Sequence, residues 1–134
     1  MYVKILFVDE WHGRRCRVFD AKDPEWGLVS DSIAALDGVR KVMVSLFERE
    51  GGESCLIVSG QWGGRVMVNA TSDDLSYLSV IDQSQPVAKR TLCVGGQDGE
   101  YDETRIVPIE WAMIAARTFY ESGKLEPSLS WNKD

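Results

Sequence analysis

Three apolar segments of the sequence follow one another at short intervals and are separated by turns rich in glycine. The segments are 41–47, 54–59 and 65–70, and the turns are 50–53 (Glu-Gly-Gly-Glu) and 60–64 (Gly-Gln-Trp-Gly-Gly). Neighbouring strands that are joined by short turns pair antiparallel. The sequence therefore predicts a β-meander in the middle of the chain.

Further strands are predicted on both sides of this meander. Before it, Tyr2–Val8 and Arg14–Phe19 flank a short turn and indicate a hairpin, and residues 20–29 are predicted to be a loop. After it, strands are predicted over 75–81, 90–94, 104–107 and 129–131, with a short helix as the alternative for the first. Most of the chain is thus assigned to β-structure.

Two helices complete the predicted elements. A short one begins after Ser30 or Asp31, either of which can cap it, and ends near Leu36. A longer one begins at Pro108, whose missing N–H is unpaired in a first turn anyway, and ends before Gly123. Its apolar residues recur at helical spacing: Ile109, Ala112, Met113, Ala116, Phe119 and Tyr120.

These elements predict one α+β domain over residues 1–134, a mostly antiparallel β-sheet meander with one long C-terminal helix and one short helix packed on it. A composition of 44% hydrophobic and 27% charged residues is typical of a folded domain. Cys16, Cys55 and Cys93 are widely spaced in apolar or alternating segments, so they are expected to be buried free thiols.

The charge balance excludes some kinds of partner. A net charge of −6 disfavours direct binding of nucleic acid, which needs a basic face. The basic residues Arg14, Arg15 and Arg17 are flanked by acidic ones and are expected to pair with them across strands. No apolar stretch approaches the roughly 20 residues that a membrane span requires, and the first apolar run is too short for a signal peptide. We therefore expect a cytoplasmic protein without a membrane partner.

The sequence offers few groups for catalysis or metal binding. His12 is the only histidine, and no Gly-x-Ser-x-Gly motif or Cys-x-x-Cys pair accompanies it. Asp98, Glu100 and Asp102 alternate as in a calcium loop, but the twelfth position of that loop holds Ile109 instead of glutamate. The tripeptide 95–97 (Gly-Gly-Gln) matches peptide release factors, but those proteins dock on RNA. We expect no enzymatic activity, no metal and no cofactor.

An acidic loop is the most unusual local feature. Its carboxylates Asp98, Glu100, Asp102 and Glu103 have no compensating base nearby, and they equal four of the six units of net negative charge. The loop is either ordinarily solvated or a surface for a positively charged partner. Trp26 and Trp62 also fall in predicted loops, where each can cover the core or serve as an anchor for a partner.

Several segments, taken in order, carry a family resemblance. They are 33–38 (Ile-Ala-Ala-Leu-Asp-Gly), 42–46 (Val-Met-Val-Ser-Leu), 63–66 leading to 70–74, 94–97 with Glu100 and Tyr101, 108–119 with Ala115 and Ala116, and 128–131 (Ser-Leu-Ser-Trp). This order resembles the first-numbered family of immunity proteins of bacterial polymorphic toxin systems. Asn132 departs from the pattern, because an acidic residue is expected after Trp131.

The resemblance implies a small inhibitor that binds a cognate toxin, commonly a deaminase or nuclease with a basic groove for nucleic acid. Asp98, Glu100, Asp102 and Glu103 would then attract the toxin, with Trp62 or Tyr101 as an anchor. Asp73 and Asp74 would extend the negative face or cap a turn. The alternatives are a small α+β enzyme or ligand-binding domain that uses the acidic-loop carboxylates, and an adaptor for a basic host protein.

Overall fold

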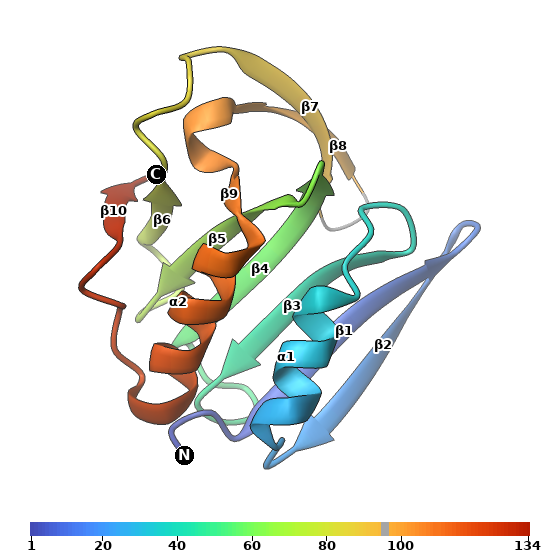
Figure 1. The fold of residues 1–134 in the computed structure, drawn as a ribbon. Coiled ribbons are helices and arrows are strands. Elements are labelled where there is room, and N and C mark those ends of the chain that lie inside the picture. The colour runs from blue at the N-terminus through green and yellow to red at the C-terminus, as the bar shows by residue number, and fades with distance from the viewer. Residues whose placement is uncertain (95–96) are drawn as a thin grey trace.

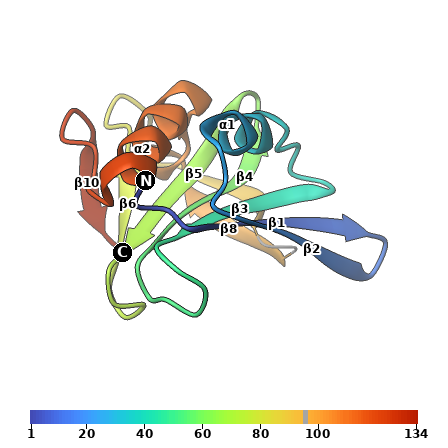
Figure 2. The same cartoon turned by 90° about the horizontal axis from the view of Figure 1, so that it is seen from below.

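The computed structural model describes residues 1–94 and 97–134 and has the predicted α+β architecture (Figure 1). In this part of the chain, eight strands form one sheet and two further strands form a separate hairpin. The helices α1 (Trp26–Ala34) and α2 (Ile109–Ser122) lie side by side on one face of the main sheet (Figure 2). Neither of these helices is long and apolar enough to cross a membrane.

The main sheet confirms the predicted meander. Its strands are β1 (Ile5–His12), β2 (Arg15–Lys22), β3 (Lys41–Phe47), β4 (Cys55–Trp62), β5 (Arg65–Thr71), β6 (Tyr77–Ile81) and β10 (Ser130–Lys133), with the short β9 (Val107–Pro108) beside β5. The order across the sheet is β10-β6-β5-β4-β3-β1-β2. Strands β3 to β6 are consecutive neighbours and pair antiparallel.

The strand β1 lies between β2 and β3, which the sequence did not indicate. Both neighbours pair antiparallel with β1, so β2 and β3 run parallel to each other. Parallel strands require a crossover connection, and α1 supplies it on the helical face.

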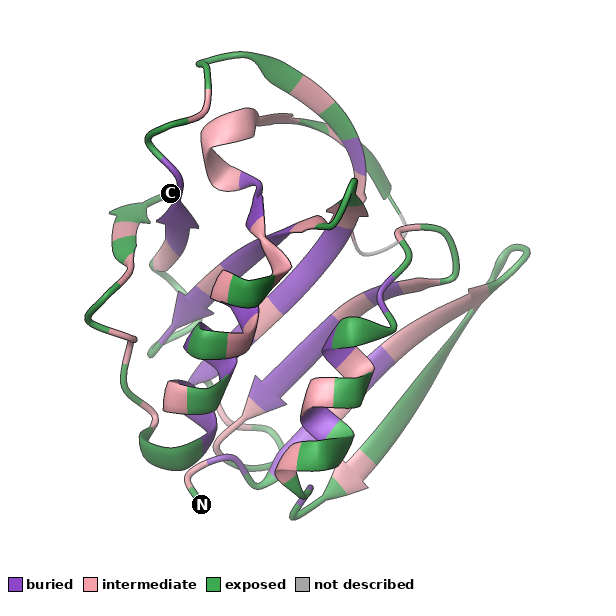
Figure 3. Ribbon diagram, viewed as in Figure 1, coloured by how far each residue is buried: buried purple, intermediate pink, exposed green. Residues whose placement is uncertain are grey.

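The main core lies between the two helices and the sheet. Alternate residues of each strand point to this side, because side chains in a strand alternate between its faces. Figure 3 shows that buried residues run along β3, β4 and β5 and recur along α2. The fully buried members of this core include Leu6, Ile33, Val44, Leu46, Leu56, Val58, Val66, Val68, Ala112, Ala116 and Phe119.

The opposite face of the sheet is partly covered by a hairpin of β7 (Lys89–Val94) and β8 (Gln97–Asp102). Met67 points to that face, because its neighbours Val66 and Val68 belong to the main core. Met67, Leu92 and Ile106 form a second, smaller buried cluster, with Val94 and Tyr101 packed against it. The hairpin is thus held to the sheet by its own apolar contacts.

The short helix begins earlier than predicted. It starts at Trp26 after Glu25, whose side chain makes no capping hydrogen bond, so Ser30 and Asp31 lie inside the helix and not at its start. The prediction of a loop over residues 20–29 is also wrong, because β2 continues to Lys22 and α1 begins at Trp26. Packing sets the first residue of α1, because the Trp26 ring packs on the Tyr120 ring of α2 with their centroids 5.5 Å apart.

Other predicted features also need correction. Residues 104–107 are a 3-10 helix (Glu103–Arg105) followed by β9, not one strand, and β6 is a strand, so its helical alternative is wrong. Of the three thiols only Cys55 is buried, whereas Cys16 is exposed. The predicted turn 60–64 is shorter: β4 continues through a bulge to Trp62, and only Gly63 and Gly64 separate it from β5.

The C-terminal end of α2 depends on a glycine, as the sequence predicts. Gly123 has a φ of 72°, and a Cβ atom there would lie 2.5 Å from the Tyr2 ring. We expect Gly123→Ala to lower the free energy of unfolding by about 2 kcal/mol, measured by urea unfolding. Gly27→Ala is the matched control, because Gly27 lies in α1 with nothing within 4 Å of the added carbon. Equal stability of the two variants would contradict this account.

Candidate partner-binding site

Six of the eight predicted site residues lie on the β7–β8 hairpin, on the 3-10 turn after it, or at the adjoining end of β4: Trp62, Asp98, Glu100, Tyr101, Asp102 and Glu103. Asp73 and Asp74 do not join them. The strand β5 starts at Arg65, opposite Trp62, and ends at Thr71 beside the turn that holds both aspartates. Six residue steps along a strand span roughly 20 Å, so the structure separates the two groups.

Asp73 and Asp74 shape the turn between β5 and β6. Asp73 Oδ1 accepts hydrogen bonds from the backbone N–H of Ser76 (3.0 Å) and of Leu75 (2.9 Å), and these bonds lower the pKa of Asp73. Asp74 has a positive φ of 60° and accepts a hydrogen bond from the Tyr77 hydroxyl. The two roles predicted for Asp73 and Asp74 are to extend the negative face or to cap a turn. The structure provides direct contacts for capping the turn.

The predicted acidic loop is a strand. Asp98, Glu100 and Asp102 belong to β8, which pairs with β7 in a continuous register from Val94 opposite Gln97 to Lys89 opposite Asp102, whereas Glu103 begins the 3-10 helix. Asp98, Glu100 and Asp102 therefore share one side of β8, and Gly99 and Tyr101 share the other. We call the side with the three carboxylates the acidic hairpin face. The predicted turn residues Gly95 and Gly96 lie outside the described residues.

Tyr101 points toward the sheet. Its ring packs against the smaller core cluster and lies over Gly99, where an added Cβ would be 3.0 Å from ring atoms. Gly99 thus leaves room for the ring. This packing gives Tyr101 a structural role in holding β8 against the main sheet.

Glu103 is paired with a base that is 13 residues away in the sequence, so the predicted lack of a compensating base is wrong for this carboxylate. Arg90 Nη2 and Nε lie 2.8 and 3.0 Å from Glu103 Oε1, and the Glu103 side chain is only 12% exposed. The Arg90 guanidinium carbon also lies 3.7 Å from the centroid of the Trp62 ring. Trp62, Arg90 and Glu103 thus form one stack that ties the hairpin to the end of β4.

Asp102 caps the 3-10 turn that follows β8. Its Oδ1 accepts hydrogen bonds from the backbone N–H (3.1 Å) and the hydroxyl (3.0 Å) of Thr104, and these bonds lower the pKa of Asp102. Asp98 and Glu100 are different: both are exposed, and neither has an ion-pair or side-chain hydrogen-bond partner among the described residues. These two carboxylates are the part of the cluster that remains free for another molecule.

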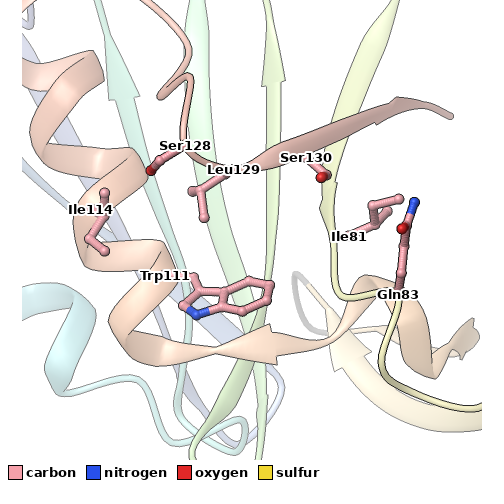
Figure 4. A pocket seen from close by; sticks show the side chains of 7 residues that line it. All are labelled: Ile81, Gln83, Trp111, Ile114, Ser128, Leu129 and Ser130. Carbon is pink, nitrogen blue, oxygen red and sulfur yellow. The ribbon is translucent and has the colours of Figure 1, made fainter.

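A pocket of about 350 Å³ lies elsewhere, beside α2 (Figure 4). Trp111 and Ile114 contribute to it from the helix, and Leu129 lies across from them. Its other lining residues are Ile81, Gln83, Ser128 and Ser130. None of these seven side chains is ionisable, so the pocket can accept an apolar group but supplies no acid or base.

Sequence reasoning missed Arg90, which connects Trp62 with Glu103. Its two partners lie 28 and 13 residues away, so no local spacing could reveal the stack. No protein-family model matches this chain, and no curated protein sequence matches it either. Its function is therefore inferred from the residues and geometry of the site and from the ordered motifs of the sequence.

Proposed function

We propose that this chain is an immunity protein that binds and neutralises a cognate polymorphic toxin through the acidic hairpin face. The main support is that Asp98 and Glu100 are exposed side by side on one strand without a cationic partner in the described residues. Crowding like charges on a strand gives the fold no stability, whereas it attracts a basic partner. A toxin domain that acts on nucleic acid, such as a deaminase or nuclease, has the basic groove that such a face would cover.

The acidic hairpin face is held in a defined position, which favours binding. Tyr101 and Leu92 pack it onto the sheet, and Arg90 joins Glu103 to Trp62. A surface that is already ordered loses less conformational entropy when a partner docks. The same carboxylates on a mobile loop would bind more weakly.

Trp62 is the proposed anchor of this interface. Trp62 is 39% exposed, and it lies next to the hairpin at the end of β4. Tryptophan supplies a large contact area and is enriched among the residues that dominate binding energy. The exposed carboxylates would raise the association rate over long range, and Trp62 would slow dissociation after contact.

The enzyme alternative uses the same carboxylates and has weaker geometric support. General acid–base catalysis needs a carboxyl group within reach of a bound substrate. Asp98 and Glu100 point away from the sheet on an exposed strand, and the pocket in Figure 4 is lined by other residues. The geometry therefore favours binding of a second protein over turnover of a small molecule.

Co-expression with the toxin domain encoded beside this gene tests the proposal. We expect the wild-type chain to restore growth and to co-purify with the toxin. Trp62→Ala is expected to weaken the complex by about 30-fold or more, as measured by calorimetry. Leu75→Ala is the control, because Leu75 is 86% exposed in the distant β5–β6 turn. If the wild-type chain neither restores growth nor co-purifies, the inhibitor proposal fails.

A further inference from the structure

The edge strand β2 is unusually open. Seven of its eight residues are exposed, and only Ala21 is partly covered. Val18 and Phe19 expose 56% and 54% of their surfaces on opposite sides of the strand. No described segment pairs with its outer edge, which Figure 1 shows at the border of the sheet.

The other edge of the sheet is protected by comparison. There, β10 has only four residues and follows Pro127 closely, both of which limit pairing with another strand. In contrast, β2 contains no proline, and its register with β1 is continuous from Lys22 to Arg15. A long, regular and partly apolar edge of this kind is a template for an additional strand.

The backbone groups available on this edge follow from the β1 hydrogen bonds. The Trp11 N–H donates to the Arg40 carbonyl (2.8 Å), on the side of β3, so Trp11 and its partner Cys16 are not hydrogen-bonded to each other. Because this pattern alternates along antiparallel strands, every second residue of β2 directs its N–H and C=O outward. These residues are Cys16, Val18, Asp20 and Lys22.

We propose that β2 pairs antiparallel with β2 of a second copy of this chain, about a twofold axis at Phe19. In this register the outward backbone groups of Val18 meet those of Asp20 of the second copy, and the two Phe19 rings lie opposite each other. Arg17 lies opposite Ala21 and Cys16 opposite Lys22 of the second copy, so no like charges are directly opposed within the strand. Aromatic pairs directly across two strands stabilise the pairing.

The neighbouring symmetric registers are less favourable. An axis at Val18 places Phe19 opposite Arg17 and so loses the aromatic pair, and an axis at Arg17 or Asp20 places that residue opposite its own copy. Like charges directly opposite each other destabilise a strand pair. The edge is thus self-complementary in the Phe19-centred register.

The inferred dimer is compatible with partner binding but does not depend on it. The hairpin contacts β3 and β4 and packs on Met67 of β5, whereas β2 is separated from β3 by β1. Pairing of the two edges therefore leaves the acidic hairpin face of each copy uncovered. Failure of the immunity proposal would leave the dimer unaffected, and the reverse also holds.

Analytical ultracentrifugation of the purified chain tests the dimer. We expect the mean mass to rise from 15.0 kDa toward twice that value as the concentration increases from about 5 to about 500 µM. Phe19→Lys is expected to raise the dissociation constant at least tenfold, because it places two like charges at the axis. Val87→Lys is the control, since Val87 is 87% exposed in a loop. A wild-type chain that stays monomeric throughout overturns the proposal. A strand of another protein would then be the remaining candidate for pairing with this edge.

Disulfide cross-linking tests the register. In a Cys16→Ser background, Phe19→Cys is expected to form a disulfide dimer with oxidised glutathione, because directly opposite residues are within disulfide distance. Val18→Cys is expected to cross-link poorly, because the two Val18 positions are diagonal, about 7–8 Å apart. Faster cross-linking of Val18→Cys than of Phe19→Cys would overturn this register. The background protein alone shows how much cross-linking comes from the other thiols.

Discussion

Replacing Asp82 with alanine is expected to lower the free energy of unfolding by about 3 kcal/mol, because it leaves a largely buried arginine without its counter-ion. Arg65 Nη2 lies 2.9 Å from Asp82 Oδ2, and the two side chains are only 19% and 8% exposed. Arg65 Nε also donates to the Ile106 carbonyl at 2.9 Å. The pair therefore joins β5, the end of β6 and the segment before α2.

Urea unfolding followed by tryptophan fluorescence measures this effect. Glu121→Ala is the matched control, because it removes the acid of the ion pair with Arg117, in which both side chains are 46% exposed. Exposed ion pairs contribute about 0.5 kcal/mol or less. Similar losses of unfolding free energy in the two variants would show that the Arg65–Asp82 pair stabilises the fold no more than an exposed ion pair does.

The contribution of Asp82 should also depend on pH. Burial tends to raise the pKa of Asp82, but hydrogen bonds from Ser84 and Arg65 together hold it below its ordinary value. A carboxyl group whose pKa is lower in the folded state stabilises the fold above its unfolded pKa of about 3.9, and this stabilisation is lost as the pH falls through the folded pKa. The free energy of unfolding of the native chain should therefore exceed that of Asp82→Ala by the full amount above about pH 5. This excess should decrease below about pH 4. A constant difference would contradict this linkage.

Reversing the charges of Asp98 and Glu100 to lysine is expected to slow association with the cognate toxin by about 10- to 100-fold at low salt. The double variant should fold normally, because both side chains are exposed and no described side chain bonds to them. Surface plasmon resonance at several salt concentrations measures the association rate. The difference from the wild-type chain should shrink as salt rises, since exposed charges are screened.

The double variant Asp31→Lys and Glu53→Lys is the control for this experiment. It changes the net charge by the same amount at exposed positions in α1 and in the β3–β4 turn. If both double variants slow association equally, the net charge of the chain sets the association rate and the acidic hairpin face has no special role. Reversal of Asp102 and Glu103 is a poorer test, because Asp102 caps a turn and Glu103 is paired with Arg90.

Local patterns in the sequence determined the central part of the fold. The strand 41–47 has the predicted bounds, and Gly123 ends α2 where its position indicates. These elements follow from alternation, helical spacing and turn residues, all of which act over a few positions. The fold class and the meander could therefore be predicted without the structure.

Only the tertiary structure decided how distant segments meet. It placed β1 between β2 and β3, and it joined Glu103 and Trp62 through Arg90, so that only Asp98 and Glu100 of the predicted acidic cluster remain exposed and unpaired in the described residues. It also showed that Asp73 and Asp74 lie in a separate turn at the end of β5 that is far from the hairpin. A charged residue's partner is set by strand order and packing, and neither is contained in the spacing of nearby residues.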